Sequence, residues 1–275
     1  MGLTFAIANQ KGGVGKTATT VNLGASLALD GFRVLVIDLD SQGSATSGLG
    51  EAHEKGLSSY EVLIGQIEIQ TAIRPTSIEN LSIIPGTRDL AGAEVELVSY
   101  DDRHSRLREQ LVKVAHDFDY IFIDCPPSLG MLTLNALCAA DAVIVPLQCE
   151  FYALEGLGAL VETLERVRVT FHPDLRILGI LLTMYDARTS LSRQIAREVR
   201  QHFGPKVLRA LVPRNVRISE SPSYGLPVVT YEPSSQGALA YRLAAKEIAE
   251  MTKPAIAGGA PEIPGVEEDN ETTPG

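Results

Sequence analysis

The sequence predicts an α/β protein with a mostly parallel, twisted sheet and helices on both faces. Three observations predict this fold. Apolar, β-branched runs of strand length recur along the chain, and most stretches between them are long enough for a crossover helix. Hydrophobicity within the runs is continuous rather than alternating, which is typical of strands buried on both faces. Polar segments close several runs, at the strand ends where such sheets bind ligands.

The predicted elements alternate between strand and helix along the chain. The runs predicted as strands are Leu3–Ala8, Val34–Asp38, Leu81–Pro85, Tyr120–Asp124, Ala142–Pro146 and Ile177–Thr183, with a strand-like segment at Val207–Leu211. We expect one helix to begin near Lys16 and another to span residues 190–202. Neither a linker nor an internal repeat is found before residue 253, so residues 1–253 are predicted to form one domain.

Residues 254–275 differ in composition from the rest of the chain. They carry five acidic residues and no basic one, they are rich in Pro and Gly, and they contain no aromatic residue. A segment of this kind buries too little apolar surface to offset the entropy of ordering. We therefore predict an acidic, disordered tail.

Composition limits the class of protein. Of the 275 residues, 45% are hydrophobic, which is enough for a substantial core. The sequence has no run of about 18 apolar residues and no charged leader, so we expect neither a membrane span nor an export signal. The three cysteines are widely spaced, which fits neither a disulfide framework nor a metal-ligand pair and favours a reducing cytoplasm.

The stretch NQKGGVGKT (9–17) follows the first predicted strand and has the composition of a phosphate-binding loop. Its glycines allow a tight curl in which N–H groups converge on phosphate oxygens, and the next helix adds its positive N-terminal end. Lys16 is predicted to reach the β- and γ-phosphates, and the Thr17 hydroxyl to ligate Mg²⁺. A second lysine, Lys11, precedes the glycines, and Gln10 stands where the usual loop begins with glycine.

Three carboxylates lie at or just after predicted strand ends. Asp124 closes the run YIFID and is predicted to hold Mg²⁺ directly or through water. Of the two acids in VIDLDSQG (36–43), we expect one to face the phosphates and the other to brace the structure. Asp40 is the candidate to orient the attacking water, and Asp38 is placed near the magnesium. The alternative is a pair of solvated loop acids and an Asp124 that only caps a turn.

Seven segments together resemble the ParA/Soj family of DNA-partition ATPases, which have a deviant Walker A loop. In chain order they are KGGVGKT (11–17), DLDSQGSATSGLG (38–50), LAGAEVELV (90–98), DCPPSLG (124–130), QCEFYALEG (148–156), LLTMYDAR (181–188) and PRNVRISESPSYG (213–225). The resemblance covers roughly residues 1–250 and implies a P-loop NTPase fold, ATP hydrolysis, and ATP and Mg²⁺ as cofactors. Ser41, in place of the family's usual Pro, and Ala18, in place of a Thr, depart from its pattern.

The resemblance explains the second lysine. In this family the additional lysine reaches across a dimer interface to the phosphates of the partner's ATP, so the dimer forms with ATP and separates after hydrolysis. The resemblance also places Thr183 and Met184 near the adenine. The residues predicted to bind ATP are Lys11, Gly12, Gly13, Val14, Gly15, Lys16, Thr17, Ala18, Pro213 and Asn215. The residues predicted to be catalytic are Lys11, Lys16 and Asp40. The residues predicted for the dimer interface are Lys11, Glu150, Tyr152 and Glu155.

The net charge of −10 hides a basic segment. Residues 188–217 contain eight basic residues and a single acid, Glu198. In the helix predicted at 190–202, Leu191, Ile195 and Val199 form the expected buried stripe, and three arginines share another face. Phosphate contacts without sequence preference are the expected mode of binding. The residues predicted to contact double-stranded DNA are Arg188, Arg193, Arg197, Arg200, Arg214 and Arg217. For Arg188 and Arg217 the prediction comes from the resemblance.

The resemblance implies a cytoplasmic, nucleoid-associated switch for chromosome or plasmid segregation, whose hydrolysis is stimulated by a ParB-type centromere-binding protein. A MinD-like membrane-cycling ATPase is the nearest alternative, but it needs a C-terminal basic amphipathic helix, and residues 258–275 are acidic and contain several prolines. An electron carrier like the nitrogenase iron protein would need cluster cysteines, whereas Cys125 and Cys149 are expected to be small core residues. A non-enzymatic scaffold is the third alternative, if Asp40 is inert.

Overall fold

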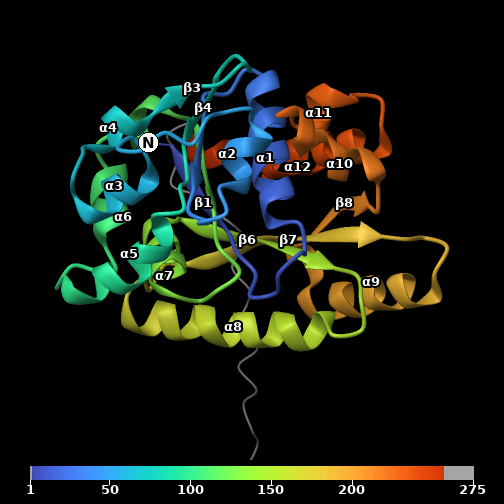
Figure 1. Ribbon diagram of the computed structural model, residues 1–275. Coiled ribbons are helices and arrows are strands. Elements are labelled where there is room, and N and C mark those ends of the chain that lie inside the picture. Colours follow the sequence, from blue (N-terminus) through green and yellow to red (C-terminus); the bar gives the residue numbers. More distant parts are fainter. Residues whose placement is uncertain (1, 257–275) are drawn as a thin grey trace, which may run out of the picture.

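Eight strands form a single sheet, which Figure 1 shows at the centre of the computed structural model with helices packed around it. The structure describes residues 2–256. The strand order is β3-β4-β2-β5-β1-β6-β7-β8, and all neighbouring strands are parallel except β3 and β4. The strands are β1 (Leu3–Ile7), β2 (Val34–Asp38), β3 (Arg74–Pro75), β4 (Leu81–Ile84), β5 (Tyr120–Asp124), β6 (Ala142–Gln148), β7 (Arg176–Tyr185) and β8 (Val207–Pro213). This sheet confirms the predicted fold class.

Strand ends differ from the prediction mainly on the β6–β7–β8 side of the sheet. The bounds of β2 and β5 are confirmed, whereas β6, β7 and β8 each run two residues further at their carboxyl ends than predicted. The sequence analysis missed β3, because a strand of two residues leaves no apolar run. β3 contains Pro75 and pairs antiparallel at the edge of the sheet, a position that tolerates proline.

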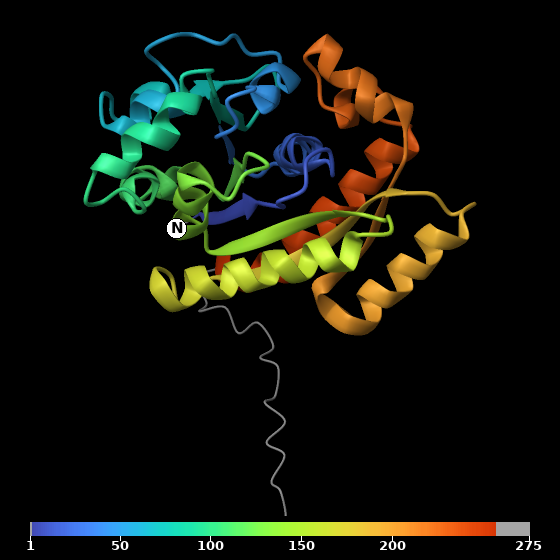
Figure 2. The same ribbon diagram turned by 60° about the horizontal axis from the view of Figure 1, so that its bottom comes forward.

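Helices cover both faces, because successive residues of a strand point to opposite sides. Phe5 and Ile7 of β1 belong to one core, while Ala6 and the adjoining Ala8 belong to the other. The first face is covered by α1 (Lys16–Leu29), α2 (Ser44–Gly48), α10 (Val216–Glu220), α11 (Val228–Tyr231) and α12 (Gln236–Ile256). The second is covered by α3 (Ser59–Ile64), α4 (Ile69–Ala72), α5 (Leu90–Glu96), α6 (Arg106–Leu111), α7 (Met131–Ala139), α8 (Ala153–Thr170) and α9 (Ser190–Phe203). Figure 2 shows α8 (yellow-green) and α9 (orange) lying beside each other.

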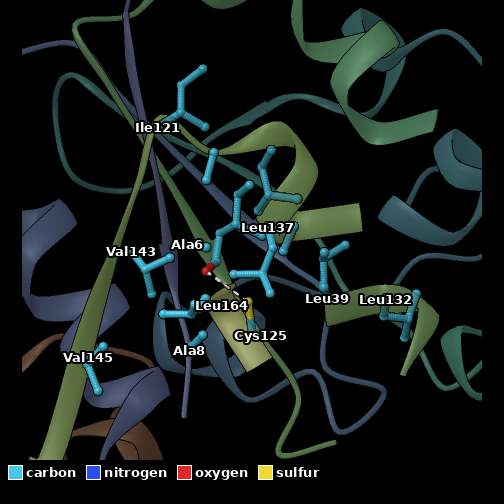
Figure 3. Packing of buried hydrophobic residues seen from close by; sticks show 14 of the residues in the cluster. Ala6, Ala8, Leu39, Ile121, Cys125, Leu132, Leu137, Val143, Val145 and Leu164 are labelled. Carbon is cyan, nitrogen blue, oxygen red and sulfur yellow. Dashed lines mark hydrogen bonds between the residues drawn. The ribbon is translucent and has the colours of Figure 1, made fainter. Parts of the chain in front are cut away.

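The cysteines belong to the hydrophobic interior. Figure 3 shows Cys125 among apolar side chains of the core, including Leu132 and Leu137 of α7 and Leu164 of α8. Cys125, Cys138 and Cys149 are all buried and free of disulfides. Burial raises the pKa of the Cys138 and Cys149 thiols to about 11, so neither is a thiolate at neutral pH. The prediction that Cys125 and Cys149 are small core residues is confirmed.

The helix α9 corrects one detail of the sequence analysis. The helix predicted at 190–202 is α9, and Ile195 and Val199 are buried as expected, but Leu191 is 41% exposed. Leu191 lies in the first turn of α9, and the buried side of the helix is completed by Ser192 and Ala196 instead. The predicted domain boundary at residue 253 falls inside α12, which continues to Ile256. The predicted tail otherwise lies outside the described residues.

The carboxyl ends of three adjacent strands converge at one edge of the sheet. β1 pairs with β5, and β5 with β2, so that Ile7, Asp124 and Asp38 lie in register. β1 is followed by the glycine-rich loop and α1, while β2 is followed by the segment that carries Asp40. Asp38 and Asp124 are 86 positions apart in the chain, and parallel pairing brings them together. Across residues 2–256, every helix is too short or too polar to cross a bilayer.

Candidate functional site

The loop between β1 and α1 is held in place by Asn9. The side-chain amide of Asn9 donates to the carbonyl of Pro146 in β6 at 2.8 Å, and its Oδ1 accepts from the N–H of Lys11 at 3.0 Å. Gly13 and Gly15 have φ values of 74° and 90°, a region that favours glycine. The loop therefore curls tightly before α1 and places Gly15 at the helix N-cap.

The two lysines of the loop lie in different environments. Lys16 is 7% exposed, and its Nζ donates to the backbone carbonyl of Lys11 at 3.2 Å. Burial lowers the pKa of Lys16, and the nearby carboxylates of Asp124 and Asp40 oppose this shift. The side chain of Lys11 is 45% exposed and forms an ion pair with Glu150 of the same chain. One lysine therefore lies inside the loop and the other stands at its rim.

Asp124, at the end of β5, accepts hydrogen bonds from two hydroxyls of α1. The Thr17 hydroxyl donates to Oδ2 at 2.8 Å, and the Thr20 hydroxyl donates to Oδ1 at 2.9 Å. The carboxyl is fully buried. Thr17 and Asp124, which the sequence analysis predicts as magnesium ligands, are therefore in direct contact.

Asp38, at the end of β2, braces the segment that follows it. Its Oδ2 accepts from the N–H and the hydroxyl of Thr46 in α2 at 2.9 and 2.8 Å, and its Oδ1 accepts from the N–H of Asp40 at 3.1 Å. The Thr46 hydroxyl accepts in turn from the N–H of Gly86, just after β4. Because both of its oxygens are engaged, Asp38 holds the path of the chain that carries Asp40.

Asp38 and Asp124 are register neighbours in adjacent strands, and both are fully buried. Burial raises the pKa of Asp124 to about 8, with the charge of Asp38 as the second cause, and burial raises the pKa of Asp38 to about 6. The pair therefore carries fewer than two negative charges at neutral pH. A cation beside Asp124 would supply the missing counter-charge, and this fits the magnesium site predicted at Thr17, Asp38 and Asp124.

The donor set also suits magnesium in particular. Within residues 2–256, no group of three or more His, Cys, Asp and Glu side chains is arranged as a metal cage. Magnesium does not need such a cage, since it keeps several waters and is bound by one or two carboxylates together with substrate phosphates. A hydroxyl and a carboxylate in contact beside a phosphate loop match that requirement.

A cavity of about 390 Å³ opens beside the loop. Its walls come from the loop and α1 and from the segments that follow β2, β5 and β8. The lining residues are Gly12, Gly13, Gly15, Lys16, Thr17, Ala18, Val21, Asn22, Asp40, Ser44, Gly48, Pro127, Ile218, Ser221, Pro222 and Leu226. Most of the predicted loop residues and Asp40 therefore face one space, whereas Lys11, Val14 and Asp38 are not part of its lining.

The residues predicted to flank the adenine do not line this cavity. Asn215 is the N-cap of α10, where its Oδ1 accepts from the N–H of Arg217 at 2.9 Å, and Pro213 ends β8. The Thr183 hydroxyl donates to the backbone carbonyl of Val14 at 2.8 Å. Thr183 thus contacts the phosphate loop itself, and the predicted place of Thr183 and Met184 near the adenine remains a prediction. The predicted contacts of Pro213 and Asn215 with adenine remain predictions.

The residues predicted for the dimer interface lie at the rim of the loop. Glu150 contacts Lys11, and Tyr152 and Glu155 are exposed just before and within the first turn of α8. Phe151 is 73% exposed and packs edge-on against Tyr152, with ring centroids 5.1 Å apart. Aromatic residues are enriched at protein interfaces, and the place of these residues in a dimer interface remains a prediction.

The arginines predicted to bind DNA lie on or just before α9 and α10, which are on the right in both Figure 1 and Figure 2. Two of them are paired within the chain: Arg188 with Asp186 and Arg217 with Glu220, each at 2.8 Å. The others are exposed or half-exposed: Arg193, Arg197, Arg200 and Arg214. DNA binding by these arginines remains a prediction.

The sequence analysis missed the second donor to each buried carboxylate and one wall of the cavity. Thr20 and Thr46 are those donors, and Thr46 lies within the matched segment DLDSQGSATSGLG. The wall consists of Ile218, Ser221, Pro222 and Leu226, in and after the matched segment PRNVRISESPSYG. The two matched segments therefore contained the signal for Thr46 and for most of the wall, although no spacing rule marks the individual residues, whereas Thr20 lies outside every matched segment.

Comparison with known proteins assigns the family. The family description "AAA domain" matches residues 2–177. The chain is 52% identical to the sporulation initiation inhibitor protein Soj of Bacillus subtilis over 250 residues, which cover 90% of this chain and 99% of that protein. It belongs to the Soj/ParA family. A further Soj/ParA relative is the chromosome partitioning protein ParA of Myxococcus xanthus, 49% identical over 92% of this chain and 90% of that protein.

Solved structures share the Soj/ParA fold. The cobyrinic acid a,c-diamide synthase of Mycobacterium smegmatis, with bound ATP analog and magnesium, is 41% identical with a TM-score of 0.81, over 93% of this chain and 97% of that chain. The cell division ATPase MinD of Pyrococcus furiosus is 28% identical with a TM-score of 0.76, over 91% and 99% of the two chains. These matches confirm the predicted P-loop fold.

The buried Asp124 makes the stability of the protein without nucleotide depend on pH. Its pKa is about 8 in the folded state, against an ordinary value of 3.8, so between these values the folded state binds more protons than the unfolded state. Stability from this group therefore falls as pH rises from about 4 to 8. We expect Asp124→Asn to have a higher melting temperature than the parent at pH 8, with a smaller difference at pH 5, in thermal scans without Mg²⁺.

Asp119→Asn is the matched control, for which we expect the stability at pH 8 to change in the opposite direction. The hydrogen bond from Arg33 lowers the pKa of Asp119, so its ionised form stabilises the folded state, and this contribution is lost as pH falls through the folded pKa. We expect this variant to melt below the parent at pH 8. An Asp124→Asn protein that lost stability at pH 8 as Asp119→Asn does would show that the buried pair is compensated without a cation.

Proposed function

We propose that this protein is an ATP-driven switch for DNA partition, which dimerises around ATP, binds DNA as the dimer and separates after hydrolysis. The single observation that carries the proposal is the pair of lysines on one loop. Lys16 is buried beside the cavity, while Lys11 stands half exposed at its rim next to exposed aromatic residues. The coarser function follows from the family: the protein is a Soj/ParA partition ATPase that uses ATP and Mg²⁺.

The residues around the cavity take separate tasks in hydrolysis. The loop N–H groups and Lys16 bind the phosphates, and Lys16 gives up its bond to the Lys11 carbonyl to do so. Asp40, at the cavity wall, orients the attacking water, and Asp38 holds Asp40 in place through its backbone. Thr17 and Asp124 would hold magnesium, which would neutralise phosphate charge when bound.

Lys11 gives the switch its dependence on a second copy. In the single chain its ammonium is paired with Glu150, in a contact partly open to solvent. Such pairs contribute only about 0–1 kcal/mol, so a partner's phosphates can compete for the lysine. Tyr152, Glu155 and the aromatic Phe151 form the contact surface around it. The triphosphate thereby becomes part of the interface, and its hydrolysis weakens the dimer.

The arginines of α9 and α10 supply the surface for DNA. In a dimer two such surfaces act together, so weak phosphate contacts on each subunit combine into useful affinity. We further propose a ParB-type partner that stimulates hydrolysis and a location on the nucleoid in the cytoplasm. Residues 1–253 are proposed as the ATPase domain, and residues 254–275 as an acidic tail outside it.

The dimer proposal is tested by size-exclusion chromatography. Asp40→Ala should bind ATP without hydrolysing it and should elute as a dimer with ATP and as a monomer with ADP. The double variant Asp40→Ala/Lys11→Ala should stay monomeric with ATP, because the trans contact to phosphate is lost. A double variant that still dimerises would contradict the role of Lys11, and an Asp40→Ala protein with normal turnover would remove Asp40 from catalysis.

Lys16→Ala serves as the reference for nucleotide binding. It removes the charge closest to the phosphates, so we expect ATP affinity to fall by at least tenfold, since hydrogen bonds to charged groups contribute about 1.5–3 kcal/mol. Isothermal titration with Mg-ATP measures this directly. Unchanged affinity in Lys16→Ala would mean that the loop does not bind phosphate.

DNA retention is tested with Arg217→Glu in the ATP-bound state. We expect binding to non-specific double-stranded DNA to weaken steeply with salt in the parent, and Arg217→Glu to reduce it by more than tenfold at constant salt. Arg168→Glu is the matched control, because Arg168 and Arg217 both pair with a glutamate three positions away on a helix and are about half exposed. Equal loss in the two variants, or binding indifferent to salt, would contradict the assigned surface.

A further inference from the structure

The phosphate loop is tied to β7 by one hydrogen bond that the proposed chemistry does not use. The hydroxyl of Thr183 donates to the backbone carbonyl of Val14 at 2.8 Å. Thr183 is 2% exposed and Val14 is 1% exposed, so water does not replace this bond. A buried carbonyl that loses its donor is unfavourable, and this contact therefore restricts the orientation of the loop.

The bond fixes the peptide plane between Val14 and Gly15. In a trans peptide the carbonyl of one residue and the N–H of the next point in opposite directions, and the described chain contains only trans peptides. With the Val14 carbonyl turned toward Thr183, the N–H of Gly15 must point away from β7. Gly15 lines the cavity, so the hydroxyl on β7 sets the direction of an amide on the opposite side of the same plane.

This plane needs an external anchor because glycine does not hold it. Gly15 has a φ of 90°, and glycine moves between positive and negative φ at little cost, so the peptide is free to rotate when it is not bonded. Thr183 is well suited to anchor it. Its backbone pairs with Gln148 of β6, and its own carbonyl accepts from the N–H of Cys149 at 3.2 Å. The hydroxyl is therefore presented from the rigid sheet.

The backbone next to Thr183 is strained. Met184 has a φ of 50°, one of two positive-φ residues other than glycine among residues 2–256. A residue other than glycine keeps such a backbone conformation only where surrounding contacts determine the path of the chain. Such outliers cluster at functional sites. Met184 lies within β7, directly after the residue that contacts the loop.

We propose that Thr183 is a positioning residue for phosphate binding: its hydroxyl orients the Val14–Gly15 peptide so that the Gly15 N–H is directed into the cavity. The inference rests on the proposed nucleotide function and assigns Thr183 to the phosphates rather than to the base. Its effect passes through the backbone of the loop, without contact between Thr183 and the nucleotide.

Isothermal titration with Mg-ADP tests the proposal. Thr183→Val keeps the shape of the side chain but removes the donor, and we expect binding about tenfold weaker than in the parent, the size of effect of one buried hydrogen bond. Thr183→Ser restores the donor and should bind within about twofold of the parent. In ATPase assays the KM for ATP should rise in Thr183→Val with kcat little changed, because the amide contacts substrate and transition state alike.

Thr252→Val is the matched structural control. Thr252 is also buried, and its hydroxyl donates to the backbone carbonyl of Ile248 at 2.8 Å, but it lies in α12 and does not line the cavity. We expect this variant to lose thermal stability and to bind Mg-ADP as the parent does. If Thr183→Val fails to fold, Thr183→Ala provides a second variant without the hydroxyl.

The outcomes separate this inference from the proposed function. Parent-like Mg-ADP affinity in Thr183→Val, or equal weakening in Thr183→Ser and Thr183→Val, would overturn the role of the hydroxyl. Equal weakening in Thr252→Val would show a general effect of stability and would overturn it as well. Failure of the parent itself to bind Mg-ADP would contradict the proposed function instead.

Discussion

The site depends on two carboxylates buried side by side. Parallel pairing of β2 with β5 places Asp38 and Asp124 in register, and the sheet leaves neither exposed to water. Buried charge is costly unless it is paired and hydrogen-bonded, and here hydroxyls and N–H groups supply the bonds. Those donors belong to α1 and to the segment after β2, so satisfying the carboxylates also attaches both to the sheet. What the pair still lacks is a positive counter-charge, which a magnesium ion can supply.

The walls of the cavity are joined to one another as well as to the sheet. A Cβ on Gly225 would lie 2.7 Å from the Cα of Gly50, so the chain after α2 and the chain after α10 touch backbone to backbone. The first of these walls is continuous with Asp40, and the second with Arg217. The segment proposed to act in hydrolysis and the segment proposed to contact DNA are therefore packed as one unit.

The loop shows how a flexible sequence becomes a rigid binding element. Its glycines permit the curl but do not select it, and the selection comes from Asn9, bonded to β6, and from Thr183 on β7. Gln10, which replaces the first glycine of the usual pattern, donates to the Ala159 carbonyl in α8. The unusual residues of the loop thus connect it to the half of the sheet that carries the proposed dimer surface, where Lys11 contacts Glu150.

The sequence by itself determined the fold class, the bounds of β2 and β5, the family, and the residues of the phosphate loop, because continuous apolar runs and glycine spacing are local patterns. Only the tertiary structure decided which hydroxyl meets which carboxylate or carbonyl. Thr20 reaches Asp124 across 104 residues and Thr183 reaches Val14 across 169, and contacts at such separations leave no periodic signal. The exposure of Leu191 has the same cause, since helical spacing shows which residues share a face but not how far the neighbouring elements cover it.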